Sequence, residues 1–130
     1  MNIPPDIKYT KNDEWIRLEG KIGTIGLTDY AQEQLSDIVF VEILVSEGEA
    51  VKQGEACATV ESVKAAAEVY SPMSGKVVAT NEVLPDTPET VNKDPYGEAW
   101  MVKVEVGNPA ELESLLDAAA YEALCAERSQ

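Results

Sequence analysis

The sequence predicts a mainly β fold, a flattened β-barrel or sandwich with short peripheral and C-terminal helices. Short segments rich in β-branched residues recur along most of the chain, and turns separate them at intervals of about eight to twelve residues. A strong apolar pattern of helical spacing is found only near the C-terminal end. The chain of 130 residues has the length of one domain. We therefore expect a single domain over residues 1–130, with a β core at about 15–106 and a helical segment at about 109–127.

The first predicted hairpin lies near the N-terminus. Residues 15–19 alternate with period two, Gly20 and Lys21 turn the chain, and residues 22–27 return as a glycine-containing strand. A short helix is expected over residues 29–35, because Thr28 before it is a good N-cap residue and an acid occupies its first turn.

The most apolar run of the chain covers residues 37–45, where Glu42 is the only interruption among the apolar residues that follow Asp37. Apolar side chains on both faces are typical of a strand that is covered on both sides. We expect this strand to lie inside the sandwich.

A second hairpin is predicted around Lys64. Val60 and Val63 favour extended backbone before the lysine, and Val69 and Tyr70 favour it afterwards. An exposed lysine at a hairpin tip keeps a solvated ammonium, which suits covalent modification better than acid–base catalysis. These residues alone leave open that Lys64 is an ordinary surface lysine.

The rest of the chain predicts one more pair of strands and a helical end. Strands are expected at 76–80 and 100–106, separated by a proline-rich surface loop at 81–95 that has room for a helical turn. Asn108, Pro109 and Glu111 form a helix-start pattern with Asn108 as the N-cap. The apolar stripe expected on the helical segment consists of Leu112, Leu115, Leu116, Ala119, Ala123 and Leu124.

The composition excludes several classes of function. The chain has 24 acidic residues against 10 basic residues and a formal charge of -14, so a nucleic-acid partner is not expected. It contains no histidine, which excludes Ser-His-Asp and Cys-His catalytic arrangements and histidine-ligated metals. We expect neither a catalytic site nor a metal site.

The two cysteines and the N-terminal residues indicate a cytoplasmic protein. Cys57 and Cys125 lie far apart and form no metal-binding or redox motif, so both are expected to be small core residues in a reducing compartment. The N-terminal residues resemble no signal or transit peptide, and no apolar segment approaches membrane-spanning length. We expect no membrane partner.

Five ordered segments resemble the H proteins of the glycine cleavage system. The resemblance extends from about Tyr9 to Tyr121, and the matching segments are GLTDYAQ at 26–32, DIVFVE at 37–42, VESVKAA at 60–66, YSPMSG at 70–75 and VNKDPYGE at 91–98. It implies a lipoyl-domain fold of two quasi-symmetric halves, with residues of about 15–106 as the lipoyl-binding core. It also places the family's modified lysine at Lys64.

The function implied by the resemblance is that of a carrier rather than an enzyme. Lipoate attached to Lys64 would receive the aminomethyl group of glycine from glycine decarboxylase (P protein), with loss of carbon dioxide and reduction of the lipoyl disulfide. Aminomethyltransferase (T protein) would pass the methylene to tetrahydrofolate and release ammonia, and dihydrolipoamide dehydrogenase (L protein) would reoxidise the dithiol. A lipoate-attaching enzyme is a further expected partner, and a monomer is expected because the carrier meets several enzymes in turn.

Three acidic residues have candidate roles beside Lys64. Glu14 occupies the glutamate of the family's H-E-W segment and is the candidate carboxylate for an amine-loaded arm in a cleft, with an exposed strand-edge acid as the alternative. Glu61 and Glu68 flank Lys64 and are candidates for recognition by the lipoate-attaching enzyme, with plain solvated charges as the alternative.

Three positions depart from the pattern of the H proteins. Asp13 replaces the usual histidine, Leu44 a usual proline and Ala99 a usual glycine. The first departure bears on how a loaded amine is held. None of the three lies in the lysine segment, so the resemblance still implies a carrier.

Two other carrier functions compete with the leading one. The first is a lipoyl relay that donates lipoate to 2-oxo acid dehydrogenase subunits, which the sequence also permits. The second is a biotin carrier, which shares the fold but usually places methionines beside its lysine, whereas Val63 and Ala65 flank Lys64. An enzyme is the least favoured class, because no nucleotide-binding or nucleophile motif is present.

Overall fold

The computed structural model describes residues 1–128 and consists mainly of short strands. The strands are β1 (Lys8–Tyr9), β2 (Glu14–Glu19), β3 (Ile22–Leu27), β4 (Ile38–Ile43), β5 (Ala50–Val51), β6 (Ala56–Ser62), β7 (Ala66–Tyr70), β8 (Gly75–Thr80) and β9 (Val102–Val106). The helices are α1 (Asp29–Leu35), α2 (Thr90–Lys93) and α3 (Ala118–Arg128), with 3₁₀ turns η1 (Leu84–Asp86) and η2 (Pro109–Ser114).

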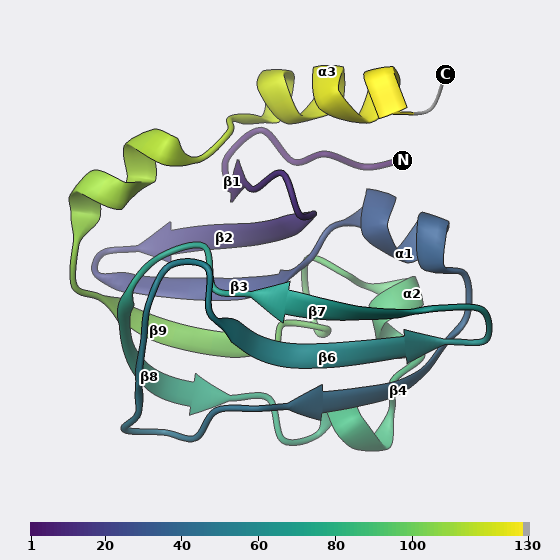
Figure 1. The fold of residues 1–130 in the computed structure, drawn as a ribbon, viewed down its shortest axis with the longest axis horizontal. Helices are drawn as coiled ribbons and strands as arrows, with labels where there is room; N and C mark the ends of the chain where they lie inside the picture. The colour runs from purple at the N-terminus through teal and green to yellow at the C-terminus, as the bar shows by residue number, and fades with distance from the viewer. Residues whose placement is uncertain (129–130) are drawn as a thin grey trace.

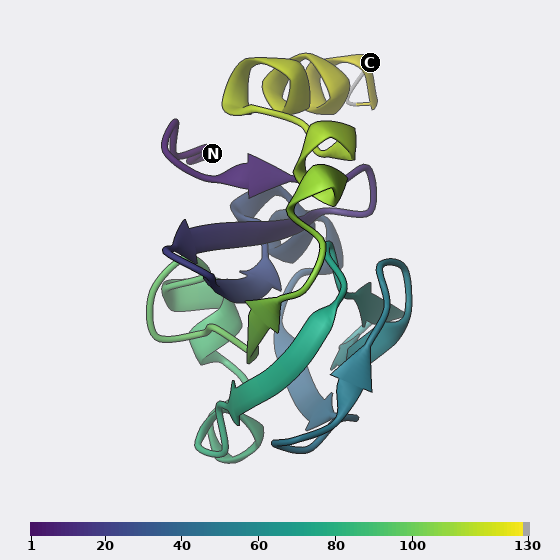
Figure 2. The ribbon, with the colours of Figure 1, turned by 90° about the vertical axis from the view of Figure 1, so that its left-hand side faces the viewer.

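Two antiparallel sheets form the body of the protein (Figure 1). The larger sheet has six strands in the order β1-β2-β3-β9-β8-β5, and the smaller sheet has three in the order β4-β6-β7. Figure 2 shows the smaller sheet standing against one face of the larger one. The predicted mainly β sandwich with short peripheral helices is confirmed.

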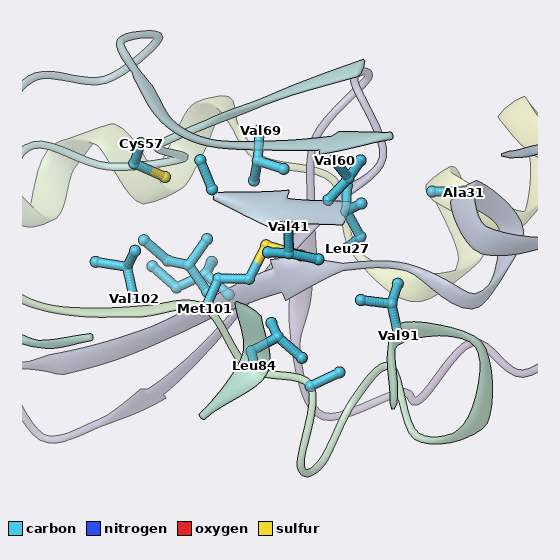
Figure 3. Packing of buried hydrophobic residues seen from close by; sticks show 14 of the residues in the cluster. Leu27, Ala31, Val41, Cys57, Val60, Val69, Leu84, Val91, Met101 and Val102 are labelled. Carbon is cyan, nitrogen blue, oxygen red and sulfur yellow. The ribbon is translucent and has the colours of Figure 1, made fainter. Parts of the chain in front are cut away.

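The core fills the space between the two sheets. Val41, Val60 and Val69 of the smaller sheet lie opposite Leu27 and Val102 of the larger sheet, and all five are buried (Figure 3). Each fully buried side chain of this size stabilises the fold by about 1.5–3 kcal/mol relative to exposure. The core therefore holds the smaller sheet, and the hairpin that it contains, in a fixed place.

The first predicted hairpin and its helix are confirmed. Strands β2 and β3 pair over their full length around a turn in which Gly20 has a φ of 63°. Trp15 pairs with Gly26, and a β-carbon on that glycine would collide with the indole ring. The hydroxyl of Thr28 accepts the N–H of Ala31 at 3.1 Å and so caps α1 as expected.

The prediction that the apolar run at 37–45 lies inside the sandwich is wrong. Strand β4 is an edge strand of the smaller sheet, and only its Ile38 and Val41 are fully buried. A bulge between residues 38 and 40 interrupts the alternation, and Val39 and Phe40 are exposed. The sequence pattern could not reveal that β4 is an edge strand. A strand covered on both faces and an edge strand that exposes apolar side chains have the same apolar composition, so composition does not distinguish them.

The C-terminal helical start is also corrected. Residues from Pro109 form the 3₁₀ turn η2, and the Asn108 side chain makes no capping hydrogen bond. Glu111 instead accepts hydrogen bonds from the N–H and the hydroxyl of Ser74, at 2.6 and 2.7 Å. These bonds join η2 to the turn before β8 and replace the expected capping role.

The buried face of α3 differs from the predicted stripe. Ala119 and Ala123 are exposed, whereas Tyr121 and Cys125 are buried. The ring of Tyr121 stacks on that of Tyr9 with 4.6 Å between centroids. Figure 2 shows η2 and α3 stacked at the end of the molecule where β1 lies. A second apolar cluster covers this end and consists of Ile7, Tyr9, Trp15, Tyr30, Tyr96, Tyr121 and Cys125.

The loop at 81–95 contains two short helical turns, η1 and α2, in accord with the prediction. Asn92 of α2 connects three elements: its side-chain oxygen accepts the Ile38 N–H at 2.9 Å, and its amide donates to Gln32 and to the Ser36 carbonyl, both at 2.9 Å. This residue fixes the start of β4 against α1.

A glycine in the larger sheet gives a test of the packing. Gly75 pairs with Val106, and a β-carbon at position 75 would overlap the backbone carbonyl of Glu105. We expect Gly75→Ala to lower the free energy of unfolding by about 1–3 kcal/mol, because backbone in a paired strand moves only at a cost. The matched control is Gly107→Ala, where the nearest atom to the new carbon is 3.9 Å away. Equal stability of the two variants in urea unfolding would contradict the described register of β8 and β9.

Candidate functional site

Lys64 lies at the tip of the β6–β7 hairpin, as predicted (Figure 1). The strands pair up to Glu61 and Ala66, and the exposed residues 63–65 form the tip. The hydroxyl of Ser62 accepts the N–H groups of Lys64 at 3.2 Å and Ala65 at 3.0 Å, and the Ser62 N–H donates to the Ala65 carbonyl at 2.7 Å. These bonds fix the backbone at Lys64 while its side chain extends into solvent.

Glu61 and Glu68 are both exposed, beside the lysine on the hairpin. Glu61 pairs with Phe40 of β4 and with Ala66 of β7, and Glu68 pairs with Thr59. The ion pair found within residues 1–128 joins Arg128 and Asp13, so neither hairpin carboxylate is neutralised by a cation of the described chain. The structure therefore places two carboxylates without an ion-pair partner on the hairpin that carries Lys64, with Glu61 nearer the tip than Glu68.

Glu14 lies at the opposite end of β7 from Lys64 and is buried, with 1% of its surface exposed. Its carboxylate accepts the Thr10 hydroxyl and, at 3.2 Å, the backbone N–H of Tyr70. The alternative of an exposed strand-edge acid is wrong. Because five residues of strand span roughly 13 Å, the Glu14 carboxylate lies far from Lys64, at the opposite end of β7.

Burial raises the pKa of Glu14 from its ordinary value of 4.5 to about 7, because the charged carboxylate loses solvation. The hydrogen bonds from Thr10 and Tyr70 oppose this rise, and the nearby charge of Asp13 adds to it. Glu14 therefore changes its charge near neutral pH, where a cationic ligand would favour the ionised form.

A cleft of about 220 Å³ opens beside Glu14. One wall comes from the turn before β2, a second from Gln53 and Gly54, and a third from the segment at 70–72. The last wall is C-terminal: Ser114, Leu115 and Leu116. Leu116 is held there by two backbone hydrogen bonds with Tyr9, each 2.8 Å long. No local sequence pattern indicates this wall, since it depends on a long-range bridge between Tyr9 of β1 and Leu116 after η2.

Asp13 anchors α3 to the turn that precedes Glu14. This residue has a φ of 69°, and its carboxylate accepts the Tyr121 hydroxyl at 2.8 Å and pairs with the Arg128 guanidinium at 2.5 Å. The Tyr121 hydroxyl also lies 2.6 Å from the hydroxyl of Thr28. The guanidinium of Arg128 stacks over the ring of Tyr30. The turn and the helix therefore support each other beside the cleft.

The cysteines offer no reactive group at this site. Both are buried and neither forms a disulfide. Burial raises the pKa of the Cys57 thiol to about 12, so the thiol is protonated at neutral pH, and the prediction of a core residue is confirmed. Residues 1–128 contain no cluster of potential metal ligands. None of the helices described is long and apolar enough to cross a membrane.

Comparison with known proteins assigns the family. The sequence model described as Glycine cleavage H-protein matches residues 7–128, nearly the whole chain. The chain belongs to the glycine cleavage H-protein family.

Similar H proteins come from several bacteria. The glycine cleavage system H protein of Symbiobacterium thermophilum is 55% identical over 126 residues, covering 97% of this chain and 98% of the relative. That of Thermotoga maritima is 53% identical over 120 residues, covering 92% and 96%. A crystal structure of a glycine cleavage system H protein from Mycobacterium marinum superposes with a TM-score of 0.81 at 34% identity, covering 98% of this chain and 100% of that one.

The three departures from the H-protein pattern have different structural consequences. Asp13 anchors α3 through Tyr121 and Arg128, a role that no local sequence pattern indicates. Ala99 is buried and adopts no positive φ, so its methyl group simply joins the core. Leu44 follows β4 with 44% of its surface exposed, and nothing in the structure explains its presence there.

The buried Glu14 predicts a specific dependence of stability on pH. Because its pKa is higher in the folded state, the stability contributed by its protonated form is fully present below pH 4.5 and is lost as the pH rises through about 7. We therefore expect Glu14→Gln to gain about 2–4 kcal/mol relative to wild type between pH 4 and pH 8, measured by urea unfolding. Glu61→Gln, which removes an exposed carboxylate instead of a buried one, is the matched control. A pH-independent difference for Glu14→Gln would show that Glu14 does not titrate in this range.

Proposed function

We propose that the chain is the lipoate-bearing carrier of the glycine cleavage system, with lipoate joined to Lys64 through an amide. The main support for this proposal is the exposed side chain of Lys64, which has no partner within residues 1–128. Its backbone is fixed by the Ser62 hydroxyl, while within residues 1–128 its ammonium makes no hydrogen bond or ion pair. The side chain is therefore free to enter the active site of another enzyme without losing an internal contact.

The residues around the tip fit an attached arm. Ala65 and Ala66 are small and exposed, so they leave the lysine accessible from the C-terminal side. Bound lipoate would supply a dithiolane that accepts the aminomethyl group of glycine together with an electron pair. The protein exposes the Lys64 side chain and fixes its backbone. A group tethered to this lysine is therefore present at a high effective concentration in the active site of a docked enzyme.

We also propose that the cleft beside Glu14 receives the amine-loaded end of the arm. Leu115 and Leu116 supply apolar surface for an aliphatic chain, and the Glu14 carboxylate supplies the negative charge for an amine. An ammonium in the cleft would favour the ionised form of Glu14, whose pKa burial has raised to about 7. Retention of the loaded end would thus be stronger above neutral pH than below it.

The proposal includes four protein partners. Glycine decarboxylase loads the carrier, aminomethyltransferase unloads it, dihydrolipoamide dehydrogenase reoxidises it, and a lipoate-attaching enzyme modifies Lys64, with Glu61 and Glu68 as charges for that enzyme to recognise. A monomer suits this task, because the same lipoyl arm must reach several active sites in turn. The chemistry belongs to the cofactor and these enzymes, and the chain acts as their common substrate.

We further propose that the chain forms a single cytoplasmic domain. The β core at about 15–106 and the helical segment at about 109–127 share the cluster around Tyr9, Trp15 and Tyr121, which supports one cooperative unit. Cys57 and Cys125 are buried and form no disulfide within residues 1–128, which is compatible with a reducing compartment.

Intact mass and peptide mapping test the attachment site directly. After co-expression with a lipoate–protein ligase and lipoate, we expect the mass of one lipoyl group on wild type, mapped to Lys64, and no such adduct on Lys64→Arg. The matched control is Lys52→Arg, because Lys52 is also exposed in a turn between short strands. This control should be modified like wild type. A lipoyl group on any other lysine, or biotin on Lys64, would overturn the proposal.

A further inference from the structure

Three exposed apolar side chains lie together beside the hairpin tip. Val39, Phe40 and Val63 have 54%, 44% and 67% of their surface exposed, and we refer to them as the tip strip. Ile38 pairs with Ser62, the Val63 N–H donates to the Asp37 carbonyl at 3.1 Å, and Phe40 pairs with Glu61. The start of β4 and the end of β6 therefore bring the strip to the same end of the molecule as Lys64 (Figure 1).

The strip is exposed because of the way β4 is built. The bulge between residues 38 and 40 breaks the alternation of the strand, so the two consecutive residues Val39 and Phe40 are both exposed. Asn92 satisfies the Ile38 N–H and anchors the strand, yet it leaves both side chains uncovered. Single exposed apolar residues are ordinary, but a group of them on an edge strand favours association with a partner.

Acidic residues lie next to the strip on the outer face of the smaller sheet. Phe40 lies beside Glu61, and the next cross-strand row contains Glu42, Thr59 and Glu68. All three glutamates are exposed, and within residues 1–128 none forms an ion pair. A surface that covers the strip would therefore need an apolar contact for Phe40 and a rim of lysine or arginine for the carboxylates.

The position of Lys64 selects among the proposed partners. Before modification its ammonium ends a stem of only four carbons, so an enzyme that acts on this nitrogen must approach the hairpin backbone itself. The other partners act on the far end of a much longer lipoyl arm, and they need not contact residues beside the tip. Attachment of lipoate therefore depends on contact with the surface next to Lys64 more than the later transfer and reoxidation reactions do.

We propose that the tip strip is the docking site of the lipoate-attaching enzyme, which would seat an apolar pocket on Phe40 and Val39 and a basic rim on the neighbouring glutamates. This inference rests on the proposed function, because it requires Lys64 to be the attachment site. It adds apolar recognition by β4 to the charge recognition already proposed for Glu61 and Glu68.

The test compares binding and modification of the unmodified protein by a purified lipoate–protein ligase. We expect Phe40→Ser to weaken binding about tenfold, measured by calorimetry, and to slow lipoyl addition, followed by intact mass, by a similar factor. Val39→Ser should weaken both by a smaller factor. Val83→Ser is the matched control, since Val83 is 66% exposed and lies outside the strip, and it should leave both within about twofold of wild type. Thermal melting of each variant confirms that it is folded, and Val39→Ser serves in place of Phe40→Ser if the latter does not fold.

The outcomes separate this inference from the proposed function. If wild type acquires no lipoyl group at Lys64, the proposed function fails. If wild type is modified and the folded strip variants bind and react as the control does, only the docking site is overturned. Loss of binding to glycine decarboxylase with unchanged binding to the ligase would also overturn it, because the strip would then serve a different partner.

Discussion

The buried carboxylate of Glu14 is the constraint on which the arrangement of the functional surface depends. Burying an ionised carboxylate costs several kcal/mol unless it is hydrogen-bonded or neutralised. Here Thr10 and the Tyr70 N–H supply hydrogen bonds to the carboxylate, while burial raises its pKa to about 7. Because Tyr70 ends the strand that begins beside Lys64, one acid connects the cleft to the lysine hairpin.

The support around Glu14 is spread over the whole chain. Asp13 holds α3 through Tyr121 and Arg128, and the chain between η2 and α3 supplies the last wall of the cleft. On the other side, the valines of β6 and β7 bind the hairpin to the larger sheet. This frame places an exposed lysine at one end and a recessed carboxylate at the other, as the proposed function requires.

The sequence predicted the parts of this structure that depend on local chemistry. The Lys64 tip, the hairpin around Gly20 and the Thr28 cap follow from neighbouring residues, so they could be assigned from pattern alone. The exposure of β4 and the burial of Glu14 could not, because each depends on which distant segment covers the strand. The cap prediction at Asn108 is wrong for a similar reason: its pattern is local, whereas Glu111 accepts hydrogen bonds from the distant Ser74. The attached group and the partner enzymes came from the family resemblance and not from physical reasoning.

The most direct test of the carrier function is the exchange of labelled bicarbonate into glycine by purified glycine decarboxylase. With wild-type protein lipoylated at Lys64, label should enter glycine at a rate that rises with carrier concentration and saturates. Lys64→Arg should support no exchange above background, and Lys52→Arg should match wild type. Absence of exchange with fully lipoylated, folded wild-type protein would contradict the carrier function and would favour a role in handing lipoate to other proteins.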